Sequence, residues 1–132
     1  MKIKITKEFE VDPKIAHAIV LLNDKGYETK YCCSGHPEEL FKDGAHNGIT
    51  YYNMGTYVSF KNRDILKDCP DNWVLMNIGG MYRFFTQEEI NLFKLDQLID
   101  LAMKELLDFA KKLPPINIYD NLYEEIKYEI IK

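Results

Sequence analysis

Arginine is scarce in this chain: Arg63 and Arg83 are the only two, and 21 acidic against 17 basic residues give a formal charge of −4 at pH 7. Proteins that coat DNA or RNA need many Lys and Arg side chains to neutralise phosphates. The composition therefore excludes a long nucleic acid as the partner. It still permits one small anionic molecule, which needs one or two cations and some backbone N–H groups.

Cysteines and long apolar runs are also few. The three cysteines are an odd number, and Cys32 is adjacent to Cys33, so they do not form a disulfide framework. No apolar run approaches the ~18 residues of a membrane span. Residues 1–5 alternate with lysine and lack the apolar core of a signal peptide. We expect a cytoplasmic protein without a membrane partner.

Familiar catalytic and nucleotide-binding motifs are missing. The sequence contains no G-x-G-x-x-G, no P-loop and no G-x-S-x-G elbow. Its many carboxylates form no pair that can be placed in one site. We therefore assign no catalytic residue and predict no cofactor, and we leave open whether the protein is an enzyme.

The composition that is present is that of a folded domain. Its 132 residues are 46% hydrophobic and 29% charged, which predicts one domain over residues 1–132. Apolar residues alternate over 2–11, which predicts a half-buried strand. Asp12 is suited to cap a helix that has Pro13 at its first position and continues to Lys25. Gly26 then supplies the left-handed residue that ends it.

The middle of the chain predicts strands. Residues 28–33 alternate β-branched and aromatic side chains and stop at Ser34-Gly35-His36. Residues 37–56 show neither helical nor strand periodicity, which predicts a long functional loop. A strand follows at 56–60, and strands at 73–78 and 81–85 are expected to pair through a hairpin at Gly79-Gly80.

The last third predicts a long helix. Thr86 and Glu89 form a capping box at its start, and an apolar stripe continues over 87–112. That surface exceeds what one layer can bury, so we expect a homo-oligomer. A short helix at 121–132 follows a possible edge strand at 116–119. The fold class is α+β: a single domain whose mixed or antiparallel sheet is covered by an N-terminal helix and a long C-terminal helix.

The turn that follows the strand predicted at 28–33 is the candidate site. The backbone N–H groups of Ser34, Gly35 and His36 are expected to converge on a phosphate or carboxylate, with His36 and Arg83 adding positive charge. Aromatic side chains around the turn are suited to hold a base. The predicted ligand-binding residues are Cys33, Ser34, Gly35, His36, Tyr57 and Arg83.

Three other interpretations of these residues stay open. Ser34-Gly35 can be an ordinary turn, since both residue types are common there. Cys33, His36, His46 and Cys69 can form a zinc site, although the second pair lacks the usual close spacing, and we expect no metal. Cys33 near His36 can also be a thiolate nucleophile, but buried cysteines are more often inert.

The motif D-P-x-I…L-L-N-x-K-G-Y-x-T-x-Y-C-C-S-G-H over residues 12–36, followed by T-Y-V-S-F at 56–60, resembles small uncharacterised proteins of Firmicutes and their phages that carry a C-S-G-H turn. More distantly, Thr29-x-x-x-Cys33-Ser34-Gly35 is similar to the T-S-S-C-S-G-R signature of the wybutosine-synthesising tRNA methyltransferases, which use S-adenosylmethionine. That likeness implies an α/β scaffold with a pocket at the C-S-G turn.

These observations predict a protein that binds a small anionic or nucleotide-like ligand at the Cys33–His36 turn. The phage resemblance further implies sequestration of a signalling nucleotide. The alternatives are a methyltransferase-like enzyme that uses S-adenosylmethionine, and a protein-interaction module that uses the long helix.

Overall fold

The structure, a computed structural model, describes residues 11–116. The segments predicted at 2–11, 116–119 and 121–132 fall outside this range, apart from Val11 and Ile116. The elements in chain order are α1 (Ala16–Asp24), β1 (Thr29–Cys33), a 3₁₀ turn η1 (Pro37–Glu39), β2 (Phe41–His46), β3 (Ile49–Asn53), β4 (Tyr57–Phe60), β5 (Trp73–Met76), β6 (Gly80–Arg83), β7 (Phe85–Thr86), α2 (Gln87–Leu92) and α3 (Leu95–Lys112).

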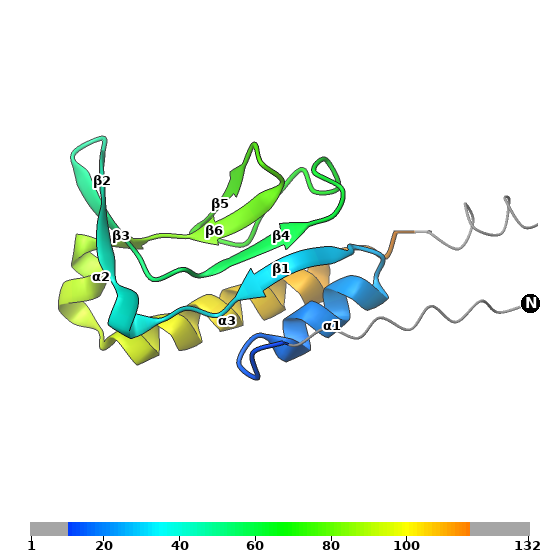
Figure 1. Ribbon diagram of the computed structural model, residues 1–132, viewed down its shortest axis with the longest axis horizontal. Coiled ribbons are helices and arrows are strands. Elements are labelled where there is room, and N and C mark those ends of the chain that lie inside the picture. Colours follow the sequence, from blue (N-terminus) through cyan, green and yellow to red (C-terminus); the bar gives the residue numbers. More distant parts are fainter. Residues whose placement is uncertain (1–10, 117–132) are drawn as a thin grey trace, which may run out of the picture.

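The strands form two antiparallel sheets. One has four strands in the order β1-β4-β6-β5, and the other has three in the order β2-β3-β7. The chain passes between the sheets three times: from β1 to β2 through η1, from β3 to β4 through residues 54–56, and from β6 to β7 through Phe84. As a result, the β2–β3 hairpin stands up at one end of the four-stranded sheet (Figure 1). The predicted α+β class is confirmed, with antiparallel pairing.

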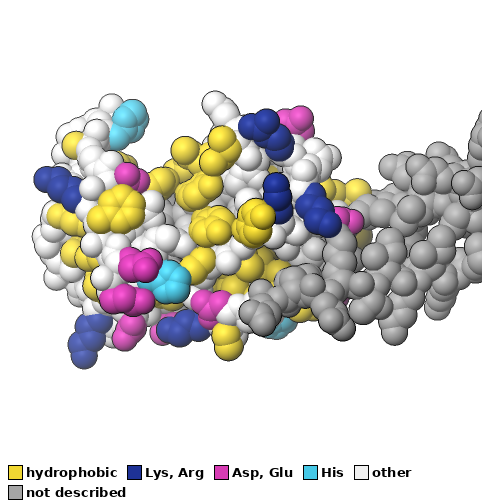
Figure 2. Space-filling model, viewed as in Figure 1, with side chains coloured by type: hydrophobic (Ala, Val, Ile, Leu, Met, Phe, Trp, Pro, Cys, Tyr) yellow, Lys and Arg dark blue, Asp and Glu magenta, His cyan; other side chains and the backbone are white. Residues whose placement is uncertain are grey.

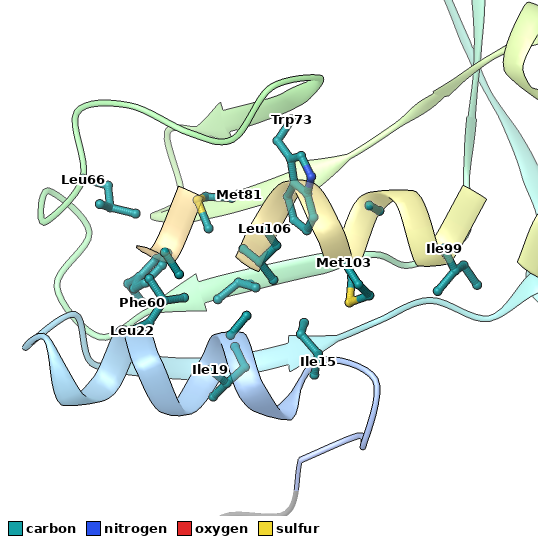
Figure 3. Packing of buried hydrophobic residues seen from close by; sticks show 14 of the residues in the cluster. Ile15, Ile19, Leu22, Phe60, Leu66, Trp73, Met81, Ile99, Met103 and Leu106 are labelled. Carbon is teal, nitrogen blue, oxygen red and sulfur yellow. The ribbon is translucent and has the colours of Figure 1, made fainter. Parts of the chain in front are cut away.

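Helices α1 and α3 lie on one side of the four-stranded sheet, and within residues 11–116 no helix lies over its other side (Figure 1). Apolar side chains of both helices meet those of the strands in one buried cluster, part of which Figure 3 shows. Its fully buried members include Ile15, Ile19, Leu22, Val58, Met81, Leu98 and Leu106. The predicted cover of the sheet by an N-terminal and a C-terminal helix is thus confirmed.

Helix α1 starts later than predicted and ends as predicted. Its first residue is Ala16, because the Asp12 carboxylate accepts from the backbone N–H of Lys14 at 2.9 Å and closes a turn there instead of capping the helix. At the other end, Gly26 has a φ of 97°, and the N–H of Tyr27 donates to the carbonyl of Leu22 at 2.9 Å. This pairing across the last turn is the expected left-handed helix stop.

The prediction of an irregular loop over 37–56 is wrong. Most of this segment is the hairpin of β2 and β3, joined by Asn47-Gly48 with φ angles of 53° and 79°. Positive φ at both central residues matches the right-handed twist of the flanking strands, and Asn-Gly is the dipeptide that favours it. Periodicity did not reveal the strands because every residue of β2 is exposed, so it carries no apolar alternation.

The prediction of one helix over 87–112 is also wrong, although the Thr86 and Glu89 capping box at its start is confirmed. Phe93 has an extended conformation and separates α2 from α3, and Gln97 accepts from the N–H of Lys94 at 3.1 Å to begin the second helix. The apolar stripe of α3 is buried under the sheet of the same chain. The homo-oligomer was expected because a single long helix would leave apolar surface uncovered. The structure leaves no such surplus for this argument, so the homo-oligomer stays a prediction without that support.

The hairpin predicted between residues 73–78 and 81–85 is confirmed as β5 and β6. Its loop lies at Asn77–Gly79, one residue earlier than predicted, because Met76 already pairs with Gly80. Gly79 alone has the positive φ, 85°, and its N–H donates to the carbonyl of Met76 at 3.1 Å.

Two leucines of α3 test where its core face lies. Leu106 is 0% exposed and Leu101 is 36% exposed. We expect Leu106→Ala to lower the free energy of unfolding by about 2–5 kcal/mol, because it leaves a cavity in the core. Leu101→Ala, the matched control, should cost well below 1 kcal/mol, as exposed positions do. Urea denaturation followed by circular dichroism measures both, and equal losses would contradict the burial pattern.

Candidate functional site

The side of the four-stranded sheet that faces away from the helices carries a row of side chains across all four strands. Cys33 of β1 pairs with Tyr57 of β4, Tyr57 pairs with Tyr82 of β6, and Tyr82 pairs with Val74 of β5. Residues directly opposite in neighbouring antiparallel strands project to the same face of the sheet. These four side chains therefore lie together; we call this side the open face.

A second row on the open face runs parallel to the first, and its members, again from β1 to β5, are Tyr31, Ser59, Gly80 and Met76. The residues that alternate with them point into the core: Cys32, Val58, Met81 and Leu75. Tyr31 is 63% exposed and Val74 is 45% exposed. Figure 2 shows hydrophobic side chains gathered across this face. So many exposed apolar groups on one face are typical of a binding surface.

Three aromatic rings form a continuous stack on this face. The centroids of Tyr57 and Tyr82 are 5.6 Å apart with an interplanar angle of 15°. Those of Tyr82 and Phe84 are 6.4 Å apart at 24°. Near-parallel rings at such distances support each other in one orientation. The ring stack thus extends from the strand opposite Cys33 to Phe84, between β6 and β7.

At its Phe84 end, the ring stack reaches a cavity of about 330 Å³ between the β2–β3 hairpin and β5. This volume lies within the range of small-ligand sites. Besides Gly44 and Ala45, its lining consists of Asp43, His46, Tyr51, Asn72, Val74 and Phe84. The cavity and the Cys33 end of the open face are therefore connected through one set of rings.

The anion-binding turn predicted at Ser34, Gly35 and His36 is not formed, because the protein's own acceptors use its donors. Both the hydroxyl and the backbone N–H of Ser34 donate to the Asp12 carboxylate. The N–H of Gly35 donates to the sulfur of Cys33, and that of His36 donates to the carbonyl of Met54 at 2.7 Å. A carboxylate from the chain itself occupies the position predicted for a ligand anion.

The Asp12 carboxylate is well stabilised in that position. Burial raises its pKa, but the hydrogen bonds from the Ser34 hydroxyl and from the backbone N–H groups of Lys14 and Ser34 outweigh this, so the pKa lies below its ordinary value. The Asp12–Ser34 contact joins the chain before α1 to the end of β1.

Cys33 and His36 do meet, as their spacing suggested. The Sγ of Cys33 lies 3.1 Å from Nε2 of His36, and Nδ1 of that ring is 3.4 Å from a carboxylate oxygen of Glu38. Burial, together with the negative charges of Asp12, Glu39 and Glu38, raises the pKa of the Cys33 thiol. A thiol with a raised pKa is a poor nucleophile. The geometry of Cys33 and His36 resembles that of a catalytic cysteine–histidine pair, but the raised pKa of the thiol disfavours the thiolate that such a pair needs.

Arg83 does not contribute to the Cys33–His36 turn. Its side chain is 1% exposed and lies on the core side of β6. Its guanidinium pairs with Glu89 at 2.8 Å, with Glu105 at 2.8 Å, and donates to the carbonyl of Phe84 at 2.7 Å. Burial lowers its pKa, but these carboxylates outweigh the effect and raise it. Since its donors are used inside the protein, Arg83 is not available to a ligand.

Of the four residues of the alternative zinc site, only Cys33 and His36 are brought together. Cys69 donates its Sγ hydrogen to the carbonyl of Trp73 at 3.2 Å, and His46 lies at the end of β2 in the raised hairpin. Across residues 11–116, no three His, Cys, Asp or Glu side chains converge as a metal-ligand set.

Comparison with known proteins gives no match: neither a family model, nor a curated protein, nor a solved structure resembles the chain at a significant level. The resemblances noted from the C-S-G-H turn therefore stay predictions. Of the helices that the structure describes, none combines the length and apolar character needed to cross a bilayer.

Sequence reasoning missed the part of the site that lies beyond the turn. It named Tyr57 as a site residue but left Tyr82 and Phe84 among the aromatic side chains around the turn, without assigning them to the site. In the structure the two rings alternate with the buried Met81 and Arg83, which places them on the face opposite the core. In the sequence, an arginine between aromatic residues favours the opposite assignment, so it gave no usable signal. The cavity residues Asp43 and Asn72 left no signal either.

Gly35 tests the packing of the turn. Its φ is 127°, and a Cβ there would lie 2.6 Å from Oγ1 of the buried Thr56. We expect Gly35→Ala to lower the free energy of unfolding by about 1–3 kcal/mol from backbone strain alone, with the clash adding to it. Gly55→Ala is the control, because Gly55 has a φ of 77° but open space around it. Thermal melts measure both, and a loss no larger at Gly35 than at Gly55 would contradict the clash.

The ion pair of Arg83 and Glu89 predicts acid sensitivity. Burial raises the pKa of Glu89, but hydrogen bonds from Arg83 and Thr86 outweigh it and the pKa is lowered. Its stabilising effect is thus complete above the unfolded pKa of about 4.3 and is lost as pH falls through the folded value. Glu89→Gln should cost about 1–3 kcal/mol at pH 7 and progressively less below pH ~4.

Denaturation of the wild type and Glu89→Gln across pH 2–7 measures this difference. Glu88→Gln is the matched control, because Glu88 is an exposed neighbour on the first turn of α2. A stability difference between Glu89→Gln and the wild type that does not change with pH would argue against the ion pair.

Proposed function

We propose that the protein binds a small ligand with a planar aromatic ring, of the nucleobase type, on the open face of its four-stranded sheet. The observation that carries this proposal is the stack of Tyr57, Tyr82 and Phe84, which leads from the Cys33 end of the face into the cavity. Every nucleobase has a π-face, and stacking on an aromatic side chain contributes about 1–3 kcal/mol per base.

The proposal moves the main ligand contact from the turn to the sheet. Around the turn, Asp12, Glu38 and Glu39 place negative charge near Cys33, which disfavours a phosphate there. The rings offer a surface for a base without any requirement for charge. His36 and Cys33 then form one edge of the site, where they limit the length of the ligand.

Binding without turnover is the function that this chemistry favours. The raised pKa of Cys33 keeps its thiol protonated at neutral pH, and we assign no other catalytic group on the open face. A sequestering protein needs only such a binding surface. The methyltransferase alternative would place the adenine of S-adenosylmethionine on the same rings, so turnover of this compound belongs in the same test.

The ring stack makes a direct prediction. Titration calorimetry with a panel of nucleosides, nucleotides, dinucleotides and S-adenosylmethionine should identify at least one that binds. Tyr82→Leu keeps an apolar side chain but removes the ring, and it should weaken that binding by about 1–3 kcal/mol. Phe93→Leu is the control, because Phe93 is a 47% exposed aromatic at the end of α2.

Two results would contradict the proposal: wild-type affinity in Tyr82→Leu, or no binding by any compound of the panel. Mass spectrometry of protein purified from cells complements the titration, since a sequestering protein retains its ligand unchanged. Release of S-adenosylhomocysteine would instead favour the methyltransferase alternative.

A further inference from the structure

The cavity at the Phe84 end of the open face combines apolar walls with a polar rim. Tyr51, Val74 and Phe84 supply the apolar surface, and Asp43, His46 and Asn72 supply polar groups. Flat apolar walls hold the body of a ring, while a few placed polar groups decide which ring is held. The chemistry of those three polar groups therefore determines the ligand class.

Asn72 offers an acceptor. Its Nδ2 donates to Oε2 of Glu105 at 2.6 Å, and Glu105 is itself held by Nε of Arg83 at 2.8 Å. An ionised carboxylate can only accept, so the amide nitrogen of Asn72 must face Glu105. This leaves Oδ1 as the group of the Asn72 side chain that meets a ligand donor. The buried Arg83 thus acts on the cavity through Glu105.

Asp43 offers a second acceptor with a full negative charge, because its carboxylate accepts only. His46 presents either a donor or an acceptor, according to its tautomer, and so does not discriminate. Among the described residues that line the cavity there is no Lys or Arg. A phosphate is therefore disfavoured inside, and a ring that brings N–H donors is favoured.

We propose that this cavity selects a planar heteroaromatic ring with an exocyclic amino group, as in adenine and cytosine, over the same ring with an oxo group at that position. The two amino hydrogens can donate to Asp43 and Asn72 together, whereas the oxo ring offers only one ring N–H and an oxygen that would face an acceptor. This inference rests on the proposed function, because it specifies which base the open face accepts.

Two matched pairs of nucleosides test the selectivity. Adenosine has an amino group beside an unprotonated ring nitrogen where inosine has an oxo group beside a ring N–H, and cytidine differs from uridine in the same way. By titration calorimetry on the full chain, we expect at least one amino nucleoside to bind about tenfold or more tightly than its partner, as a hydrogen bond to a charged group allows. Equal affinities in both pairs, or a preference for the oxo member, would overturn the selectivity while the proposed function stands.

Absence of binding by all four nucleosides would overturn this inference, and the wider panel then decides the proposed function separately.

Two variants locate the effect. Asp43→Asn removes the charge, and Asn72→Gly removes the amide at a residue whose φ of 68° glycine readily adopts. Each should reduce the amino preference several-fold, mainly by weakening the amino member. Asp68→Asn, an exposed aspartate outside the cavity, is the control.

Thermal melts of the three variants confirm folding before titration. Asn72→Gly can be unstable because it loses the contact with Glu105. In that case Asp43→Asn alone tests whether the cavity causes the amino preference, since Asp43 is exposed on β2 and its substitution should not affect folding. An amino preference that persists unchanged in Asp43→Asn would overturn the assignment to this cavity.

Discussion

The burial of Arg83 is the constraint on which the other parts of the structure depend. It is the one charged side chain in the buried set of the described chain, and an unpaired charge there would cost several kcal/mol. Glu89 from α2 and Glu105 from α3 must therefore approach β6 together. This requirement accounts for the break between α2 and α3, where the sequence has neither Gly nor Pro. The Arg83 guanidinium also donates to the backbone carbonyl of Phe84. The ring of that residue lies where the open face meets the cavity.

Much of the fold could be predicted because its signals are local. The capping box of Thr86 and Glu89, the Gly26 helix stop and the alternation in β1 each depend on residues within one or two turns of chain. The β2–β3 hairpin also had a local signal, Asn47-Gly48, but apolar periodicity is absent from a strand exposed on both faces. The rule that long aperiodic segments are loops therefore failed where a turn dipeptide was the better guide.

The candidate site was harder to predict because it depends on which residues pair across strands. Ser34 and Asp12 are 22 residues apart, and only the folded chain shows that this carboxylate takes the donors of the turn. Similarly, an arginine between aromatic residues suggests a ligand contact until its partners Glu89 and Glu105 are known. The Cys33–His36 contact was predictable, since residues so close in sequence meet in a turn. Its electrostatics were not, because they depend on Asp12.

The exposed hairpin has a kinetic consequence for any ligand in the cavity. The β2–β3 hairpin is joined to the body by the short pairing of Tyr51 and Tyr52 with β7 and by the hydrogen bond from the Tyr52 hydroxyl to Gln87 at 2.5 Å. All of β2 is exposed, so displacing this wall uncovers little of the core. Segments with few buried contacts open far more often than the whole protein unfolds. If the cavity holds a ligand as proposed, the opening rate of the hairpin, and not the strength of ring stacking alone, would set how long that ligand remains bound.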